Sequence, residues 1–170
     1  PIVSATYAID YSIWVLDPYG YHLTNVIIHI ICCLLLFKIF RVLFWRYKYR
    51  NIISLLSTLI FAVHPIHTEA VSWVSGRTDS LVTLFFFASF LFYLEFTKEL
   101  EYNKEENSLH KITKKNYIYL FLSLLFYAGG LLTKEMIVTM PVIIVLYDFV
   151  YRKKGMKYFK ENMINYILFF

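Results

Sequence analysis

His22–Phe40 reads HLTNVIIHIICCLLLFKIF, a run of 19 residues in which Lys38 is the one charged side chain. A transmembrane helix needs about 20 predominantly apolar residues, so this stretch predicts a helix that crosses a bilayer. Other apolar stretches follow it, at Ile52 to Val63, Ser80 to Phe96 and Tyr117 to Tyr151, and another begins at Met163. The sequence therefore predicts an all-α fold, a polytopic transmembrane helix bundle with about five spans.

The composition supports membrane insertion and argues against two other classes of protein. Hydrophobic residues make up 59% of the 170 residues and aromatic residues 20%, above the apolar share of ordinary soluble domains. The net charge of +5 does not predict nucleic-acid binding, because the basic residues lie in blocks beside apolar spans. Cys32 and Cys33 are adjacent on one predicted helix, which indicates packing rather than a disulfide or a metal pair.

The basic residues predict the orientation of the chain. Fifteen of the 17 fall in three blocks, namely Lys38, Arg41, Arg46, Lys48 and Arg50, then Lys98, Lys104, Lys111, Lys114 and Lys115, then Arg152, Lys153, Lys154, Lys157 and Lys160. Basic loops stay on the cytoplasmic side, so an even number of crossings separates each block from the next. The polar stretches His64–Asp79 and Thr133–Glu135 then turn on the opposite, exoplasmic side.

The opening segment is predicted to lie on the membrane. Pro1 to Leu16 is too short to cross comfortably, and Asp17–Gly20 is a turn signal. We therefore expect two parts, an exoplasmic interfacial helix at 1–20 and a transmembrane bundle at 21–170. The opening segment, His64–Asp79 and Thr133–Glu135 would form one polar cluster on the exoplasmic surface.

His64, His67 and Glu69 place two imidazoles close to a carboxylate. Their spacing is not that of a His-Glu-x-x-His metal motif, and Pro65 interrupts any helix that would hold both rings on one face. We therefore expect no metal here. Two interpretations stay open for these residues: hydrogen-bond partners at a span end, or recognition of a substrate or lipid headgroup.

Arg77 and Lys134 are the two basic residues outside the three blocks. Arg77 follows Gly76 at the start of a span, where a long side chain reaches headgroups by snorkelling. Lys134 and Glu135 lie between two apolar halves, and ionisable residues at such depth pair with each other or line a functional cavity. The acids of this surface are Asp10, Asp17, Glu69, Asp79 and Glu135.

Three strings carry a resemblance to a known family. They are Leu16–Asn25 (LDPYGYHLTN), His64–Arg77 (HPIHTEAVSWVSGR) with Asp79, and Lys134-Glu135-Met136 followed by Pro141 and Tyr147-Asp148. The sequence resembles the transmembrane and tetratricopeptide-repeat protein family, a set of O-mannosyltransferase-type membrane proteins of the GT-C glycosyltransferase superfamily. The resemblance extends in order from about Pro1 to Asp148.

The resemblance implies an enzyme that transfers a sugar, usually mannose, from a polyprenyl or dolichyl phosphate to Ser or Thr hydroxyls of an acceptor protein. A departing phosphate needs positive charge, so Arg77 and Lys134 are the candidate phosphate-binding residues. His64, His67, Glu69, Asp79 and Glu135 are expected to shape the substrate site. The catalytic carboxylate of the superfamily would lie before Pro1 and a helical-repeat region after Phe170, so we expect this fragment to be inactive alone.

Two other function classes remain open, a membrane transporter and a non-catalytic membrane scaffold. A transporter would hold its substrate near the midplane, whereas the ionisable residues here cluster at one face. Beyond membrane lipid, the lipid-linked sugar and the acceptor protein, we expect no cofactor, metal or nucleic acid. The expected location is a multi-pass protein of the endoplasmic reticulum membrane in a eukaryote, or of the plasma (inner) membrane in a prokaryote.

Overall fold

The computed structural model describes residues 1–105, 114–151 and 169, with side chains described outside 99–105 and 114–115. These residues form α-helices and short 3-10 helices (η), and no strand occurs among them. The elements are α1 (Ile2–Trp14), α2 (Pro18–Leu43), α3 (Arg50–Val63), η1 (Pro65–His67), α4 (Thr68–Ser72), η2 (Val74–Gly76), α5 (Arg77–Glu105), α6 (Lys114–Leu131), η3 (Glu135–Thr139) and α7 (Met140–Tyr151). The predicted all-α fold is confirmed for this part of the chain.

The first two helices meet at a capped turn. The Asp17 carboxylate accepts a hydrogen bond from the Tyr19 N–H, and Pro18 occupies the first turn of α2, where its missing N–H costs nothing. The long helix thus starts at Pro18, inside the segment that the sequence assigns to the interfacial helix. Gly20 is needed here because a Cβ would lie 2.1 Å from the Trp14 ring.

α3 is followed by a sharp bend that ends its apolar run. The axes of Arg50–Val63 and Pro65–Ser72 differ by 49°. The cause is Pro65, which cannot donate to the helix and which forces His64 into an extended conformation with ψ 129°. The segment Pro65–Gly76 then folds back as three short helical turns, which we call the bent segment.

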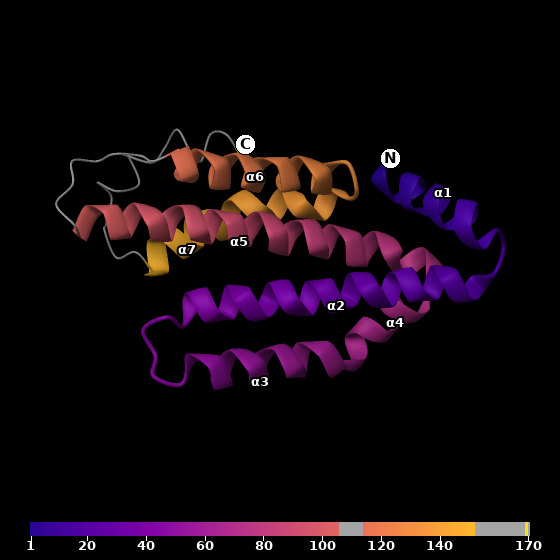
Figure 1. The fold of residues 1–170 in the computed structure, drawn as a ribbon, viewed down its shortest axis with the longest axis horizontal. Helices are drawn as coiled ribbons and strands as arrows, with labels where there is room; N and C mark the ends of the chain where they lie inside the picture. The colour runs from indigo at the N-terminus through magenta and orange to yellow at the C-terminus, as the bar shows by residue number, and fades with distance from the viewer. Residues whose placement is uncertain (106–113, 152–168, 170) are drawn as a thin grey trace.

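α5 is the central helix of the bundle. The apolar part of α5 is more deeply buried than that of α2, and α5 packs on both α2 and α6 (Figure 1). Gly129 and Gly130 allow α6 to approach closely, since a Cβ at Gly129 would lie 2.8 Å from the Phe85 ring. One turn from this contact, Ser89 and Ser123 donate hydrogen bonds to each other's carbonyl oxygens at 2.8 Å.

Among the described residues, two helices, α2 and α5, are long and apolar enough to cross a membrane. The bent pair formed by α3 and the residues after it would make a third. The apolar part of α6, Asn116–Leu131, is shorter. The stretch Tyr117–Tyr151 does divide near Thr133–Glu135 as predicted, and Pro141 lies in the first turn of α7. About five spans are not confirmed, and the start at Met163 and the third basic block lie outside the described residues.

The polar segments gather at one end of the bundle (Figure 1). α1, the start of α2, the bent segment and the connection from α6 to η3 all lie at this end, whereas the turn between α2 and α3 lies at the other. This arrangement agrees with the predicted polar cluster and positions the candidate site.

Candidate functional site

A pocket of about 600 Å³ lies where the bent segment, α2, α3, α5 and η3 meet, and we call it the loop pocket. Its polar lining includes two carboxylates, Glu69 and Asp79, and two imidazoles, His29 and His67. The hydroxyls of Ser80, Thr83 and Thr139 add further hydrogen-bonding groups, and the apolar wall includes Phe61, Phe86, Phe87, Met136 and Ile137. Its lining contains aromatic rings together with hydroxyl and carboxylate groups.

Lys134 reaches this pocket through an ion pair. Its Nζ pairs with the carboxylate of Asp79, 55 residues away in the sequence. Both side chains keep solvent access, with 30% of Lys134 and 52% of Asp79 exposed. The hydrogen bond to Asp79 raises the pKa of Lys134, so its ammonium group is charged at neutral pH.

The His29 and His67 rings form one side of the pocket together with Phe61. The Phe61 and His67 ring centroids lie 4.2 Å apart, and His29 lies 5.8 Å from Phe61 and 5.6 Å from His67. His29 Nε2 is also 3.3 Å from the carbonyl oxygen of Ala62. This packing holds the bent segment against α2.

The Glu69 side chain differs from Asp10 and Asp79, two other acids at this end of the bundle. Asp79 forms an ion pair with Lys134, and Asp10 forms an ion pair with Arg77. Among the described side chains, Glu69 has neither an ion pair nor a hydrogen bond, although it lines the loop pocket. Glu69 is therefore available to accept a hydrogen bond from a ligand.

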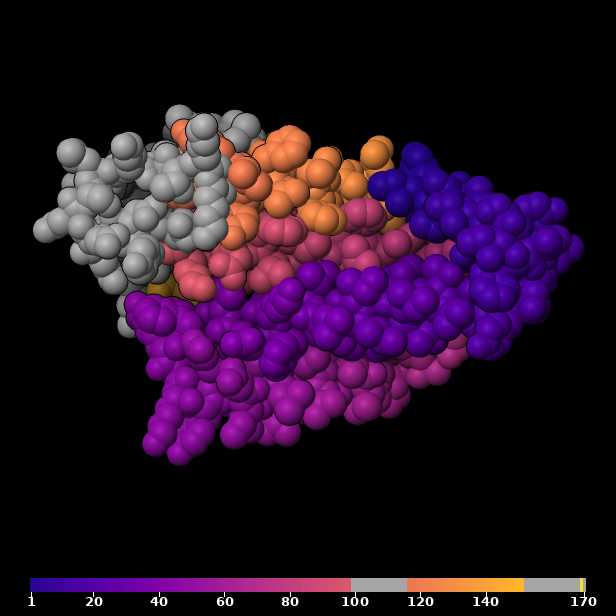
Figure 2. Space-filling model, in the orientation of Figure 1, coloured from indigo at the N-terminus to yellow at the C-terminus, as the bar shows by residue number. Residues whose placement is uncertain are grey.

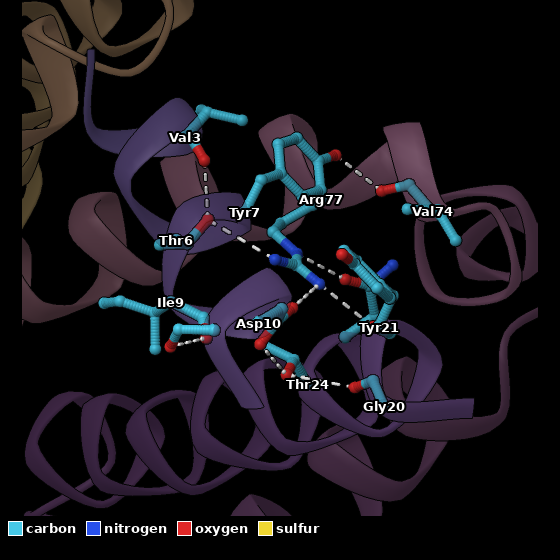
Figure 3. A network of polar contacts seen from close by, with 12 residues as sticks. Val3, Thr6, Tyr7, Ile9, Asp10, Gly20, Tyr21, Thr24, Val74 and Arg77 are labelled. Atoms are coloured by element: carbon cyan, nitrogen blue, oxygen red, sulfur yellow. Dashed lines mark hydrogen bonds and ion pairs between the residues drawn. The ribbon is translucent and has the colours of Figure 1, made fainter. Parts of the chain in front are cut away.

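Arg77 does not line the pocket and is completely buried. Its guanidinium points toward Asp10 and Tyr21 (Figure 3). Its Nη2 is 2.5 Å from Asp10 Oδ2 and donates to the Tyr21 carbonyl oxygen, while Nε donates to Asn25 Oδ1 at 2.9 Å. The guanidinium also stacks over the Tyr7 ring at 4.5 Å. Arg77 neither snorkels to the surface nor points into the loop pocket.

The Arg77 network fixes the bent segment in place. Asn25, which accepts from Arg77, donates through Nδ2 to the carbonyl oxygen of Trp73 at 2.9 Å. Tyr7 of α1 donates to the carbonyl oxygen of Val74 at 2.7 Å, and burial raises the pKa of its hydroxyl. α1 is thereby tied to the segment that carries His67 and Glu69.

Gly76 completes this packing at the end of the bent segment. A Cβ here would lie 2.7 Å from the carbonyl oxygen of Glu69 and 2.9 Å from the Cα of Ala70, both backbone atoms. Glycine is required because the backbone at the end of η2 lies directly against the backbone of α4.

The remaining predicted residues lie outside the pocket. His64 is exposed, and its Nδ1 accepts a hydrogen bond from the Ile66 N–H, which caps η1. Glu135 is exposed at the first position of η3, and Lys134 forms its ion pair with Asp79 rather than with Glu135. The described residues contain no group of three His, Cys, Asp or Glu side chains that could hold a metal, and a metal-free site stays a prediction.

Comparison with known proteins identifies relatives over most of the chain. Protein O-mannosyl-transferase TMTC4 of Mus musculus is 35% identical over 158 residues, which cover 87% of this chain and 20% of that protein. Protein O-mannosyl-transferase tmtc2 of Xenopus laevis is 30% identical and covers 98% of the chain. The human TMTC3 protein is 39% identical over a shorter region, 55% of the chain.

The chain belongs to the TMTC family. This confirms the family that the three strings indicate. No family model and no solved structure matches the chain. The chain spans about a fifth of the length of the TMTC4 proteins that it matches.

In this TMTC-family chain the loop pocket brings together His67, Glu69 and Asp79, with Lys134 beside them. The substrate role of these residues stays a prediction. His29 and Asn25 were not among the predicted site residues, although His29 lines the pocket and Asn25 positions the bent segment.

Proposed function

We propose that this chain is part of a membrane-embedded protein O-mannosyl-transferase. It would take mannose from a polyprenyl-phosphate carrier and transfer it to Ser or Thr hydroxyls of an acceptor protein at the exoplasmic face. The names of the TMTC-family relatives support mannosyl transfer, and the two basic blocks before residue 116 support the orientation. A bundle of about five spans belongs to the same proposal.

The loop pocket is the observation that carries the proposal. Carboxylates accept hydrogen bonds from sugar hydroxyls, and the Phe61, Phe86 and Phe87 side chains offer apolar surface to the C–H groups of a sugar ring. Its described lining contains neither Lys nor Arg, which suits a neutral sugar better than a phosphate. We therefore place the mannose in the pocket and the carrier phosphate at its edge.

Lys134 is the cation that we assign to the carrier phosphate. It already pairs with an anion, Asp79, beside the pocket, and it keeps solvent access. A phosphate arriving there would compete with the Asp79 carboxylate for the same ammonium group. For Arg77 the phosphate role also stays a prediction, but its guanidinium would first have to leave Asp10 and its buried position.

The general base is assigned to none of the described residues. An acceptor hydroxyl needs a base within about 3 Å of its proton. Under this proposal the protein resides in the endoplasmic reticulum membrane of a eukaryote or the plasma membrane of a prokaryote.

Lys134→Met in the full-length protein is expected to weaken use of the donor. A hydrogen bond to a charged group contributes about 1.5 to 3 kcal/mol, so the KM for polyprenyl-phosphate mannose should rise about tenfold or more. The measurement is the transfer rate to a Ser/Thr peptide against donor concentration.

Lys134→Arg is the matched control, because it keeps the positive charge and should retain most donor affinity. Unchanged donor kinetics in Lys134→Met would refute the phosphate assignment. A full-length protein that transfers no sugar under any condition would instead favour the transporter or scaffold alternatives.

A further inference from the structure

The turn between α2 and α3, residues 44–49, places cations over aromatic rings at the end of the molecule opposite the loop pocket. Arg46 lies over the Trp45 ring at 4.9 Å, and Lys48 lies over the Tyr49 ring at 5.6 Å. One helical turn earlier, Arg41 lies over the Phe37 ring at 5.8 Å. The turn projects from the lower left of the space-filling view (Figure 2).

The charge around this turn is entirely positive. No Asp or Glu occurs between Asp17 and Glu69. The same stretch contains five Lys or Arg residues, namely Lys38, Arg41, Arg46, Lys48 and Arg50. All five are exposed. No ion pair joins any of them to a carboxylate among the side chains that the structure describes. These cations are available to an external anion.

The turn is built in a defined shape rather than as a loose connection. The Tyr47 N–H donates to the Phe44 carbonyl oxygen at 2.9 Å, and the Phe44 ring stacks on Phe40 at 5.9 Å. Above this base the Trp45, Tyr47 and Tyr49 side chains are 53%, 61% and 61% exposed. Exposed Trp and Tyr of this kind are enriched at the headgroup level of membranes.

The length of α2 places the turn at that level. At about 1.5 Å per residue its 26 residues extend about 39 Å, which exceeds the hydrocarbon thickness of about 30 Å. Exposed aliphatic side chains of α2 and α3, including Leu34, Ile52, Leu55 and Leu56, continue up to the turn from both helices. An anion that meets these cations therefore does so at a lipid surface.

We propose that the turn at 44–49 with its neighbouring cations binds the phosphate headgroups of anionic phospholipids. A guanidinium that lies over a ring keeps its N–H edges free, and its planar fork fits two phosphate oxygens. The exposed rings lie beside the acyl chains while the cations meet the headgroup. A soluble acidic polymer would leave these rings and aliphatic side chains uncovered, so lipid is the better partner.

The test uses Trp45 as a local reporter. Trp14→Phe and Trp73→Phe leave Trp45 as the one Trp of the 170-residue chain, which is reconstituted in phosphatidylcholine vesicles. A minor fraction of phosphatidylserine brominated on its acyl chains should quench Trp45 more than the same fraction of brominated phosphatidylcholine. Arg46→Gln with Lys48→Gln should reduce the preference for the anionic lipid by roughly twenty-five-fold, about fivefold for each cation near the membrane surface.

Three controls make the result specific. Lys98→Gln removes an exposed cation that already pairs with Glu95, and should leave the preference unchanged. A variant with Trp73 as the one Trp reports the opposite end and should show no preference for the anionic lipid. Inorganic phosphate at constant ionic strength should not displace the lipid, and circular dichroism checks that each variant is helical.

Equal quenching of Trp45 by the two brominated lipids overturns the proposal. Displacement of the lipid by inorganic phosphate also overturns it, because the turn would then be a site for free anions. A preference that survives the double substitution shows that these cations do not create it.

Discussion

Replacing Arg77 by Met is expected to lower the free energy of unfolding by about 3 to 5 kcal/mol, the loss typical when one partner of a buried ion pair is removed. Arg77 is completely buried, and the substitution leaves the Asp10 carboxylate in the interior without its cation. It also removes the donors to Asn25 and Tyr21, which tie α2 to the start of α5. The measurement is reversible denaturant unfolding of the protein in detergent.

Two variants calibrate this result. Lys134→Met breaks an exposed ion pair and should cost no more than about 1 kcal/mol. Arg77→Met combined with Asp10→Leu removes both buried charges and should recover much of the lost stability. If Arg77→Met is no more destabilising than Lys134→Met, the buried network does not hold the bent segment.

The same double variant separates two roles for Arg77. If the Arg77 guanidinium contacts the carrier phosphate, restoring the stability of the protein does not restore that contact. The KM for the donor would then stay high in the double variant. A guanidinium that only positions the bent segment would leave donor KM near that of the parent protein. The geometry favours the second result, because Arg77 faces Asp10 and not the loop pocket.

Glu69→Gln is expected to reduce kcat/KM for the mannose donor by about tenfold to a hundredfold, corresponding to about 1.5 to 3 kcal/mol for a hydrogen bond to a charged group. Glu69 lines the loop pocket, and no described cation competes for its carboxylate. Sugar hydroxyls are donors, and a carboxylate is a stronger acceptor than the amide that replaces it. The measurement is initial-rate kinetics of the full-length protein.

Glu95→Gln is the matched control for Glu69→Gln. Glu95 lies on α5 beside Lys98, far along the helix from the loop pocket, and its loss should leave the kinetics unchanged. Parent-level kcat/KM in Glu69→Gln would show that the pocket does not use this carboxylate.

The helices and their breaks could be predicted from the sequence because their causes are local. Apolar runs define α2 and α5, Pro65 ends α3, and the polar triplet at Thr133–Glu135 divides the last apolar stretch. Gly129 and Gly130 allow close packing against Phe85 and Ile137 because they carry no Cβ. Charge counting also placed the polar segments at one end, as the ion pair between Asp79 and Lys134 confirms.

The partners of the charged residues could not be predicted, because they depend on long-range packing. The snorkelling interpretation of Arg77 rested only on its position at the end of a span. It could not include Asp10, which lies 67 residues away in the sequence and pairs with Arg77 in the fold. The sequence left two interpretations of Lys134 open, an ion pair with its neighbour Glu135 or the lining of a functional cavity. The fold pairs Lys134 with Asp79 instead. His29 was not among the predicted site residues, because its contact with His67 depends on the bend at Pro65.

Blocking the loop pocket tests the central claim most directly. Thr83 lines the pocket, and Ser75 is exposed on η2 outside it, so Thr83→Cys and Ser75→Cys form a matched pair in a full-length background that carries Cys32→Ala and Cys33→Ala. If the pocket holds the mannose of the donor, a bulky thiol reagent should abolish transfer by Thr83→Cys, saturating donor should slow that modification, and Ser75→Cys should stay active after labelling. Complete modification of the Thr83→Cys protein with undiminished transfer would contradict the assignment of the pocket to the sugar donor.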